Sequence, residues 1–287
     1  MKRPLKQRRF ALFAAALWAA FGEPALATEL TPPTAEAFQH YVSATEARIQ
    51  REVADPATFL YFDSLPEKQK RAMLERLQSG RVVIEPMHSR ENGKEIEIPD
   101  GLVHDWLAIG FIPGATRDQA LVLAEDYARQ TVVFGPDVQR VQVLSHEGQH
   151  YLVYFRLCKQ AFVTVAYDTE FSIDYFLPDS KRAYSISRAL RIAELENPGK
   201  ANEEHLPPGK DHGYMWRFNL YTRYLERDHG VYVQIEFLAL SRSVPTFWGW
   251  LINPYVRSIP RDYLTRYVLV TRRELTTAAG QARAGTN

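Results

Sequence analysis

Two spacings of apolar residues divide the chain. Between Thr34 and Val53, largely apolar side chains recur every three or four residues, the spacing of a helix with one buried face. The members of this stripe are Phe38, Tyr41, Val42, Thr45, Ile49 and Val53. A second helix is expected from Ser64, where Ser64-Leu65-Pro66-Glu67 matches a capping box, to Gly80, a residue suited to the left-handed cap. Residues 28–80 are therefore predicted to form a helical N-terminal region.

From Arg81 onward the apolar spacing changes to two, and turn residues recur every ten to fifteen positions, as in antiparallel strands joined by hairpins. Strands are expected near 82–86, 101–112, 138–145, 150–160, 162–176, 182–195, 213–226 and 231–240. One helix interrupts them from Thr116 to about Phe134, with Ala120, Leu123, Ala124 and Tyr127 on one side. A last helix begins at Pro260, with an apolar stripe of Tyr263, Leu264, Tyr267, Val268 and Thr271.

The final hairpin allows a prediction of register. A two-residue turn at Asp228-His229 places Arg227 opposite Gly230 and pairs Tyr221 with Glu236. The apolar face of this hairpin is then Trp216, Phe218, Leu220, Thr222, Tyr224, Val231, Val233, Ile235, Phe237 and Ala239. The other face carries Arg217, Asn219, Tyr221, Arg223, Tyr232, Gln234 and Glu236, which form either a solvated salt-bridge ladder or a polar ligand-recognition patch. A register shifted by one residue would exchange the two faces.

Two neighbouring segments leave alternatives open. In the strand before this hairpin, Tyr184, Ile186, Leu190 and Ile192 share one side with Arg182, Arg188 and Glu194, so its inner face is mixed and leaves room for a buried polar anchor. In the connection to the last helix, Phe247, Trp248, Trp250 and Tyr255 either line a tunnel mouth or seat the helix by packing.

This order of elements resembles the START and Bet v 1-like superfamily. The segments that carry the resemblance are Gly213–Asn219, Val231–Glu236 and Leu240–Pro245, which look like exported bacterial members of unassigned activity. The resemblance spans about residues 101–275 and implies an α+β helix-grip fold for the domain at 81–275, in which a curved antiparallel sheet wraps around a long C-terminal helix and leaves a tunnel. It also implies an apolar ligand such as a lipid, sterol or polyketide.

In such a fold, the apolar face of the last hairpin opposes either the helix stripe or a bound molecule. The predicted ligand-binding residues are Trp216, Phe218, Leu220, Tyr224, Val233, Ile235, Phe237, Tyr263, Leu264, Tyr267 and Val268. The candidate polar anchors are Arg217, Asn219, Tyr221 and Glu236. Residues 276–287 are expected to form a flexible tail.

The first residues have the features of a secretory signal peptide. Five cations precede an apolar run from Phe10 to Phe21, and the small-residue sequence Ala25-Leu26-Ala27 follows. The run has 12 residues, fewer than the ~20 of a membrane-spanning helix. Cleavage after Ala27 would leave a chain with no stable membrane anchor, in the periplasm or outside the cell.

Charge and cysteine content narrow the function further. The formal charge of +1, from 35 basic and 34 acidic residues, becomes about −3 without residues 1–27, because five cations and one anion leave with them. This charge argues against a nucleic-acid partner. Cys158 is the single cysteine and cannot form an internal disulfide.

No segment predicts catalysis, a metal or a cofactor. His146-Glu147-Gly148-Gln149-His150 matches the H-E-x-x-H zinc motif, but that motif requires a helix, and the alternating residues around Gly148 favour a hairpin tip. Ser241 and Cys158 are expected to have no neighbouring base, and they lack the G-x-S-x-G turn of a nucleophile, so spacing does not indicate a nucleophilic triad. No glycine-rich phosphate loop is present.

Three functional hypotheses follow. The first is a carrier or sensor that encloses an apolar or amphipathic small molecule without catalysis. The second is a cyclase, isomerase or hydrolase on the same scaffold, with Glu236 or Tyr221 as acid or base. The third is a structural adaptor without a ligand, which a tunnel filled by side chains would favour.

Overall fold

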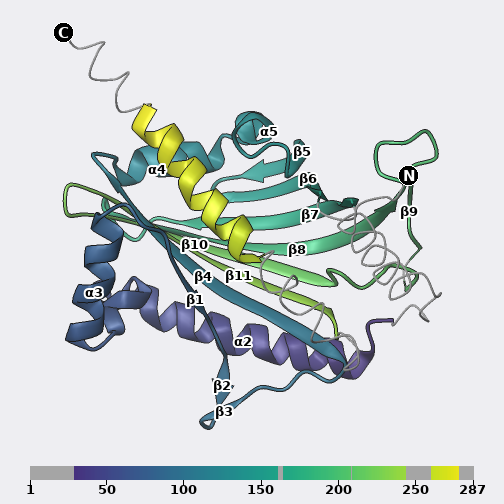
Figure 1. Cartoon of the computed structure of the whole chain (residues 1–287), viewed down its shortest axis with the longest axis horizontal. Coiled ribbons are helices and arrows are strands. Elements are labelled where there is room, and N and C mark those ends of the chain that lie inside the picture. The colour runs from purple at the N-terminus through teal and green to yellow at the C-terminus, as the bar shows by residue number, and fades with distance from the viewer. Residues whose placement is uncertain (1–28, 161–163, 208, 244–259, 278–287) are drawn as a thin grey trace, which may run out of the picture.

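A computed structural model describes residues 29–160, 164–207, 209–243 and 260–277 (Figure 1). The predicted signal peptide at 1–27, the aromatic segment 247–255 and most of the predicted tail lie outside the described residues. Among the described residues, no helix is long and apolar enough to cross a bilayer.

The centre of the fold is a nine-stranded antiparallel sheet that curves around the C-terminal helix (Figure 1). Its strands run in the order β1-β4-β11-β10-β8-β7-β6-β5, and β9 pairs with β8. Their bounds are β1 Val83–Pro86, β4 Gly101–Pro113, β5 Val138–Glu147, β6 His150–Gln160, β7 Thr164–Phe176, β8 Arg182–Glu196, β9 Glu204–His205, β10 Arg217–Arg227 and β11 Gly230–Arg242. A separate small hairpin is formed by β2 Arg90–Glu91 and β3 Lys94–Glu95. This sheet and the C-terminal helix, residues 260–277, confirm the predicted helix-grip fold.

The β10–β11 hairpin has the predicted register. Arg227 pairs with Gly230 and Tyr221 with Glu236, because Asp228 and His229 both take positive φ angles and form the two-residue turn. The two sets of alternating side chains therefore lie on opposite faces of this hairpin, as the sequence predicted. Phe218, Val233 and Ala239 face the inner side of the sheet, toward the C-terminal helix.

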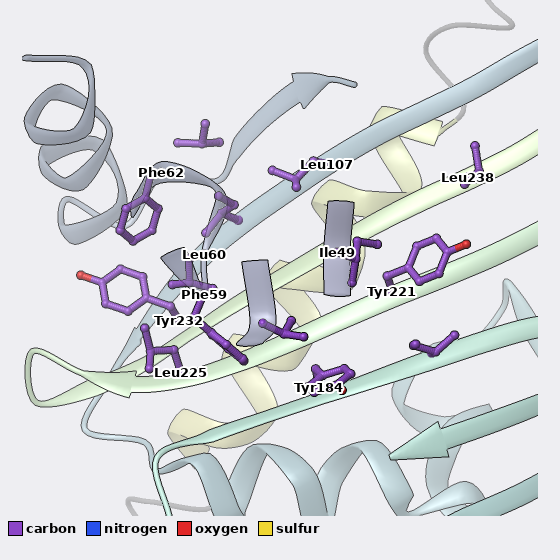
Figure 2. Close-up of a cluster of buried hydrophobic side chains, with 14 of the residues drawn as sticks. Ile49, Phe59, Leu60, Phe62, Leu107, Tyr184, Tyr221, Leu225, Tyr232 and Leu238 are labelled. Carbon is purple, nitrogen blue, oxygen red and sulfur yellow. The ribbon is translucent and has the colours of Figure 1, made fainter. Parts of the chain in front are cut away.

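The N-terminal helices cover the opposite, outer face of the sheet. α2 Pro32–Ala54 is followed by the 3₁₀ turns η1 Pro56–Thr58 and η2 Tyr61–Ser64 and by α3 Glu67–Gln78. The predicted stripe of α2 is buried in full. Together with sheet residues it forms the outer core, whose most enclosed members include Ile49, Phe59, Leu60, Phe62, Leu107, Tyr221, Tyr232 and Leu238 (Figure 2).

Two predicted helices differ in detail from the observed ones. Ser64 ends η2 and does not cap α3, because Pro66 forces an extended conformation on Leu65 and the helix begins only at Glu67. The helix expected at 116–134 is interrupted at Asp126, whose backbone is not helical. It is divided into α4 Arg117–Glu125, η3 Tyr127–Arg129 and α5 Gln130–Val133.

The predicted inner face of β8 is wrong over its first half. Tyr184 and Ile186 belong to the outer core, and Ser185 and Ser187 face inward. The reason is a β-bulge: β7 and β8 shift register beside Phe171, so Leu190 is left exposed and Ile192 returns to the inner side. A bulge reverses which residues share a face, and sequence alternation alone does not locate it.

Candidate functional site: a cavity beneath the C-terminal helix

A cavity of about 110 Å³ lies between the inner face of the sheet and the helices that cover it. β10 and β11 contribute one wall, and the C-terminal helix contributes another through Tyr263, Tyr267 and Thr271. A third wall comes from α4, η3 and α5, and the last from β6, β7 and β8. The predicted space between sheet and helix is therefore present, although it is narrow.

The lining of the cavity is aromatic and hydroxyl-bearing. Its aromatic members are Tyr127, Phe134, Phe155, Phe171, Tyr175, Phe218, Tyr224, Tyr263 and Tyr267, and further hydroxyls come from Ser185, Ser187, Thr222 and Thr271. No acidic, basic or histidine side chain is among the described residues that line it. Such a wall favours an uncharged ligand, because an ion would lose its hydration without gaining a counter-charge.

The predicted ligand-binding residues fall into three groups. Phe218, Leu220, Tyr224, Ile235, Tyr263 and Tyr267 line the cavity. Val233, Phe237, Leu264 and Val268 share the inner side but are part of the packing between sheet and helix. Trp216 is a correction: it lies in the outer core, and its Nε1 donates to Asp211 Oδ1 at 3.2 Å. β10 begins only at Arg217, so the strand alternation does not extend to Trp216.

Most of the lining was not predicted as part of a site: six of its 22 residues were. The apolar side of α4, with Ala120, Leu123 and Ala124, was predicted as a helix stripe, and it contributes to the cavity together with Tyr127. Phe155, Phe171 and Tyr175 come from strands whose alternation was visible in the sequence. The order of strands in the sheet, which brings β6 and β7 around to the same space, was the missing information.

The candidate polar anchors do not face this cavity. Asn219, Tyr221 and Glu236 lie on the outer face beneath α2, and Arg217 is exposed and donates to the Trp216 carbonyl. The solvated ladder is also wrong, because Tyr221 and Glu236 are only 2% and 1% exposed. Sequence alternation distinguishes two faces of a hairpin but does not show what covers each of them.

Ion pairs connect this buried polar layer to α2. Arg223 donates to Glu52 at 2.6 Å and to the Phe59 carbonyl at 2.8 Å. Arg48 pairs with Glu52 and Glu236. Arg188 binds both carboxylate oxygens of Glu46 at 2.8 Å, and the Tyr221 hydroxyl donates to the same carboxylate at 3.2 Å. The layer thus joins the N-terminal helix to the sheet, a structural role that needs no ligand.

A pair of buried carboxyl groups completes the layer. The Tyr41 hydroxyl donates to Asp105 Oδ2 at 2.9 Å, while Asp105 Oδ1 and Glu236 Oε2 have no hydrogen-bond partner among the described residues. Burial raises the pKa of Asp105 well above its ordinary value, and the neighbouring charge of Glu236 raises this pKa further. Asp105 therefore retains a proton at a pH where exposed aspartates have lost theirs.

The H-E-x-x-H string lies at a hairpin tip, as predicted. His146 and Glu147 end β5, Gly148 takes a φ of +58° and His150 begins β6. The ring of His146 contacts the Gly148 carbonyl, and His150 contacts Asp174 at 2.7 Å. The two imidazoles are held by separate partners rather than on one face of a helix, so the geometry that gives this motif its zinc chemistry is not formed.

Ser241 does have a neighbouring histidine, which corrects an expectation from the sequence. His104 Nε2 lies 2.9 Å from Ser241 Oγ, and both side chains are buried. Strand pairing between β4 and β11 brings them together across 137 positions of sequence, too far for a local motif to reveal. Burial lowers the pKa of His104 to about 4 and is the sole cause of the shift, so no described carboxylate orients the imidazole as in a catalytic triad.

Comparison with solved structures finds START-type proteins. Human STARD10 is 9% identical, with a TM-score of 0.43 over 72% of this chain and 80% of that one. A STAR-related lipid transfer protein fragment from Xanthomonas axonopodis is 16% identical, with a TM-score of 0.41 over 61% and 96%. The di-domain aromatase/cyclase StfQ of the steffimycin biosynthetic pathway is 14% identical, with a TM-score of 0.42 over 62% of this chain and about half (53%) of StfQ.

The sequence matches no protein-family model and no curated protein. The fold of the described residues is a helix-grip fold, an assignment carried by the arrangement of sheet and C-terminal helix. Likenesses as distant as these say nothing about a ligand or a reaction.

Proposed function

We propose that this protein is an exported carrier or sensor that encloses an apolar or amphipathic small molecule beneath its C-terminal helix. The observation that carries the proposal is the uncharged cavity between the sheet and that helix. Burial of apolar ligand surface contributes about 25 cal/mol per Å², so binding in this space requires no catalytic group.

The size of the cavity limits the ligand. Pockets for drug-sized molecules have volumes of roughly 300–1,000 Å³, and an apolar cavity near 150 Å³ holds benzene. A space of about 110 Å³ therefore suits a body of about one ring. A longer lipid requires the C-terminal helix or α4 to move outward.

Export is part of the proposal and is supported by the sequence alone. The basic start of the chain, its short apolar run and Ala25-Leu26-Ala27 favour cleavage and release into the periplasm or medium. Fractionation of cells that produce the full chain, with sequencing of the mature N-terminus, tests this part.

Two rival hypotheses lose their support in the structure. An enzyme based on Glu236 or Tyr221 would need those groups at the cavity, but both lie beneath α2 on the other face of the sheet. The hypothesis of an adaptor without a ligand requires a tunnel filled by side chains. The cavity here instead has walls from several elements and an interior volume.

Native mass spectrometry of gently purified protein, followed by extraction of bound molecules, tests the proposal directly. Ile235→Trp provides the matching variant, because Ile235 is fully buried and lines the cavity. The larger ring should occupy the space and abolish uptake of the extracted ligand, or of fluorobenzene as a surrogate. Since existing space absorbs part of the added volume, the expected loss of stability is about 1–3 kcal/mol.

Val233→Trp is the control for cavity filling. Val233 is on the same strand and face, is equally buried, and does not line the cavity. Val233→Trp should lower the free energy of unfolding far more than Ile235→Trp does, and urea denaturation of both variants measures this difference. Equal and severe destabilisation by both variants, together with wild-type protein that binds no apolar probe, would favour the adaptor.

A further inference from the structure

Strand β8 presents four small side chains on the inner side of the sheet. At alternate positions before its bulge, these are Ala183, Ser185, Ser187 and Ala189. The two serines line the cavity, whereas the two alanines pack in the inner core and do not line it. Alanine therefore satisfies the need for a small residue on this side, and of the four positions only the two that border the ligand space carry a hydroxyl group.

Ser187 has no polar neighbour across the strands. It pairs with Ile173 of β7 and with Leu220 of β10, whose side chains are hydrocarbons that also line the cavity. The Ser187 hydroxyl makes no hydrogen bond within the part of the chain that the structure describes. Its proton and its lone pairs are therefore free for a molecule in the cavity.

Ser185 occupies the next inward position of the same strand. It is only 6% exposed and pairs with Tyr175 of β7 and Thr222 of β10. The Tyr175 hydroxyl donates its single proton to the Ala124 carbonyl at 3.3 Å, so this proton is not given to the serine. Residues 29–160, 164–207, 209–243 and 260–277 provide no hydrogen-bond partner for the Ser185 hydroxyl. Ser185 is thus a buried hydroxyl at the wall of the cavity without a partner in that wall.

These two hydroxyls determine which ligand suits the cavity. A ligand without polar atoms would exclude water from both serines and leave their hydroxyls buried without hydrogen bonds, which costs free energy. A ligand hydroxyl both donates and accepts, so it recovers this free energy by bonding to a serine.

We propose that Ser185 and Ser187 form a subsite for a hydroxyl group of the ligand. The ligand class is an uncharged one-ring aromatic alcohol or phenol, whose ring contacts the aromatic walls of the cavity and whose hydroxyl binds the serines of β8. This inference rests on the proposed function, because it names which small molecule the cavity takes.

The experiment compares two probes of similar size, 4-fluorophenol and 4-fluorotoluene, in which a methyl group replaces the hydroxyl. Their affinities for the full-length mature protein at pH 7 are measured by ¹⁹F NMR, with fluorobenzene as a test of ring binding. In the double variant Ser185→Ala, Ser187→Ala, we expect the ratio of the 4-fluorophenol affinity to the 4-fluorotoluene affinity to fall roughly fivefold, the factor of one hydrogen bond between neutral groups. The affinity for 4-fluorotoluene should stay equal or increase, which also shows that the variant is folded.

Ser172→Ala is the matched control. Ser172 lies on the neighbouring strand β7, pairs with Arg188 of β8 and does not line the cavity. The ratio of affinities should be that of the wild type in this variant. A ratio that is unchanged in the double serine variant, or that falls equally in Ser172→Ala, overturns the subsite and leaves the proposed function intact.

Two results with the wild type separate the subsite from the proposed function. Binding of fluorobenzene without binding of 4-fluorophenol overturns the subsite alone. Failure of all three probes to bind overturns the proposed function together with the subsite.

Discussion

The raised pKa of Asp105 favours its neutral form in the layer of charges beneath α2. The ion pairs of that layer involve three arginines and three glutamates, Arg48, Arg188, Arg223, Glu46, Glu52 and Glu236, whose charges cancel. Asp105 is a further carboxyl group and would leave the layer negative if it ionised. Asp105 Oδ1 and Glu236 Oε2 are both buried without a hydrogen-bond partner among the described residues, so a proton on Asp105 would supply a donor where only acceptors are present.

This arrangement predicts how Asp105 links stability to pH. Its pKa is higher in the folded protein than in the unfolded chain, so the folded state binds the extra proton and loses stability as pH rises from about 3.9 to the folded-state pKa. Asp105→Asn should abolish this component and stabilise the protein at pH 8, by about 1.4 kcal/mol for each unit of the pKa difference. Urea denaturation of both proteins at pH 5 and pH 8 measures the effect.

The control for this prediction is Asp118→Asn, which changes a carboxylate whose side chain is 75% exposed. It should leave the pH dependence of stability as it is in the wild type. A parallel pH dependence of wild type and Asp105→Asn would show that Asp105 is already ionised in the folded protein.

At the scale of elements, one glycine determines how closely the C-terminal helix approaches the sheet. A Cβ atom at Gly110 of β4 would lie 2.2 Å from Cγ1 of Val268 on that helix. Val268, Leu264, Ile235 and Ala108 form a fully buried contact at this point. The close approach places the helix over the cavity, so packing at Gly110 and the width of the ligand space are linked.

Gly110→Ala should therefore displace the helix and reduce stability by about 1–3 kcal/mol. Val268→Ala should also destabilise the protein, because it leaves a void. In the double variant the new methyl group fills the space that Val268 vacates, so the combined loss should be smaller than the sum of the two. Thermal or urea unfolding of all four proteins measures this coupling, and strict additivity would mean that the two residues do not touch.

Sequence reasoning succeeded where local geometry controls the element. A two-residue turn fixed the register of β10 and β11, and three- to four-residue spacing identified six of the seven buried positions of α2. Sequence reasoning failed where a segment distant in the chain determines the position or the burial of a side chain. Three features depend on how strands and helices are placed across the sheet. They are the bulge in β8, the burial of Glu236 beneath α2 and the contact of His104 with Ser241.

For the whole molecule, the sheet has two cores with different roles. Its inner face encloses the cavity, whereas its outer face is closed by α2, η1, η2 and α3 over an apolar cluster and the ion-pair layer. Phe59, Leu60, Phe62 and Leu77 of the N-terminal region are fully buried against that outer face. The helices therefore complete the core of the sheet, and their own apolar faces are buried against it.

This dependence predicts that residues 28–80 do not fold alone. About fifty residues in two main helices bury too little apolar surface between themselves to offset their conformational entropy. The isolated fragment should lack a cooperative thermal transition by circular dichroism. The complementary fragment 81–287 should aggregate or bind a hydrophobic dye, because it exposes Tyr232 and Leu238 and leaves Arg223 without Glu52. Adding the two fragments together should restore a cooperative transition, whereas cooperative unfolding of 28–80 by itself would establish it as an independent domain.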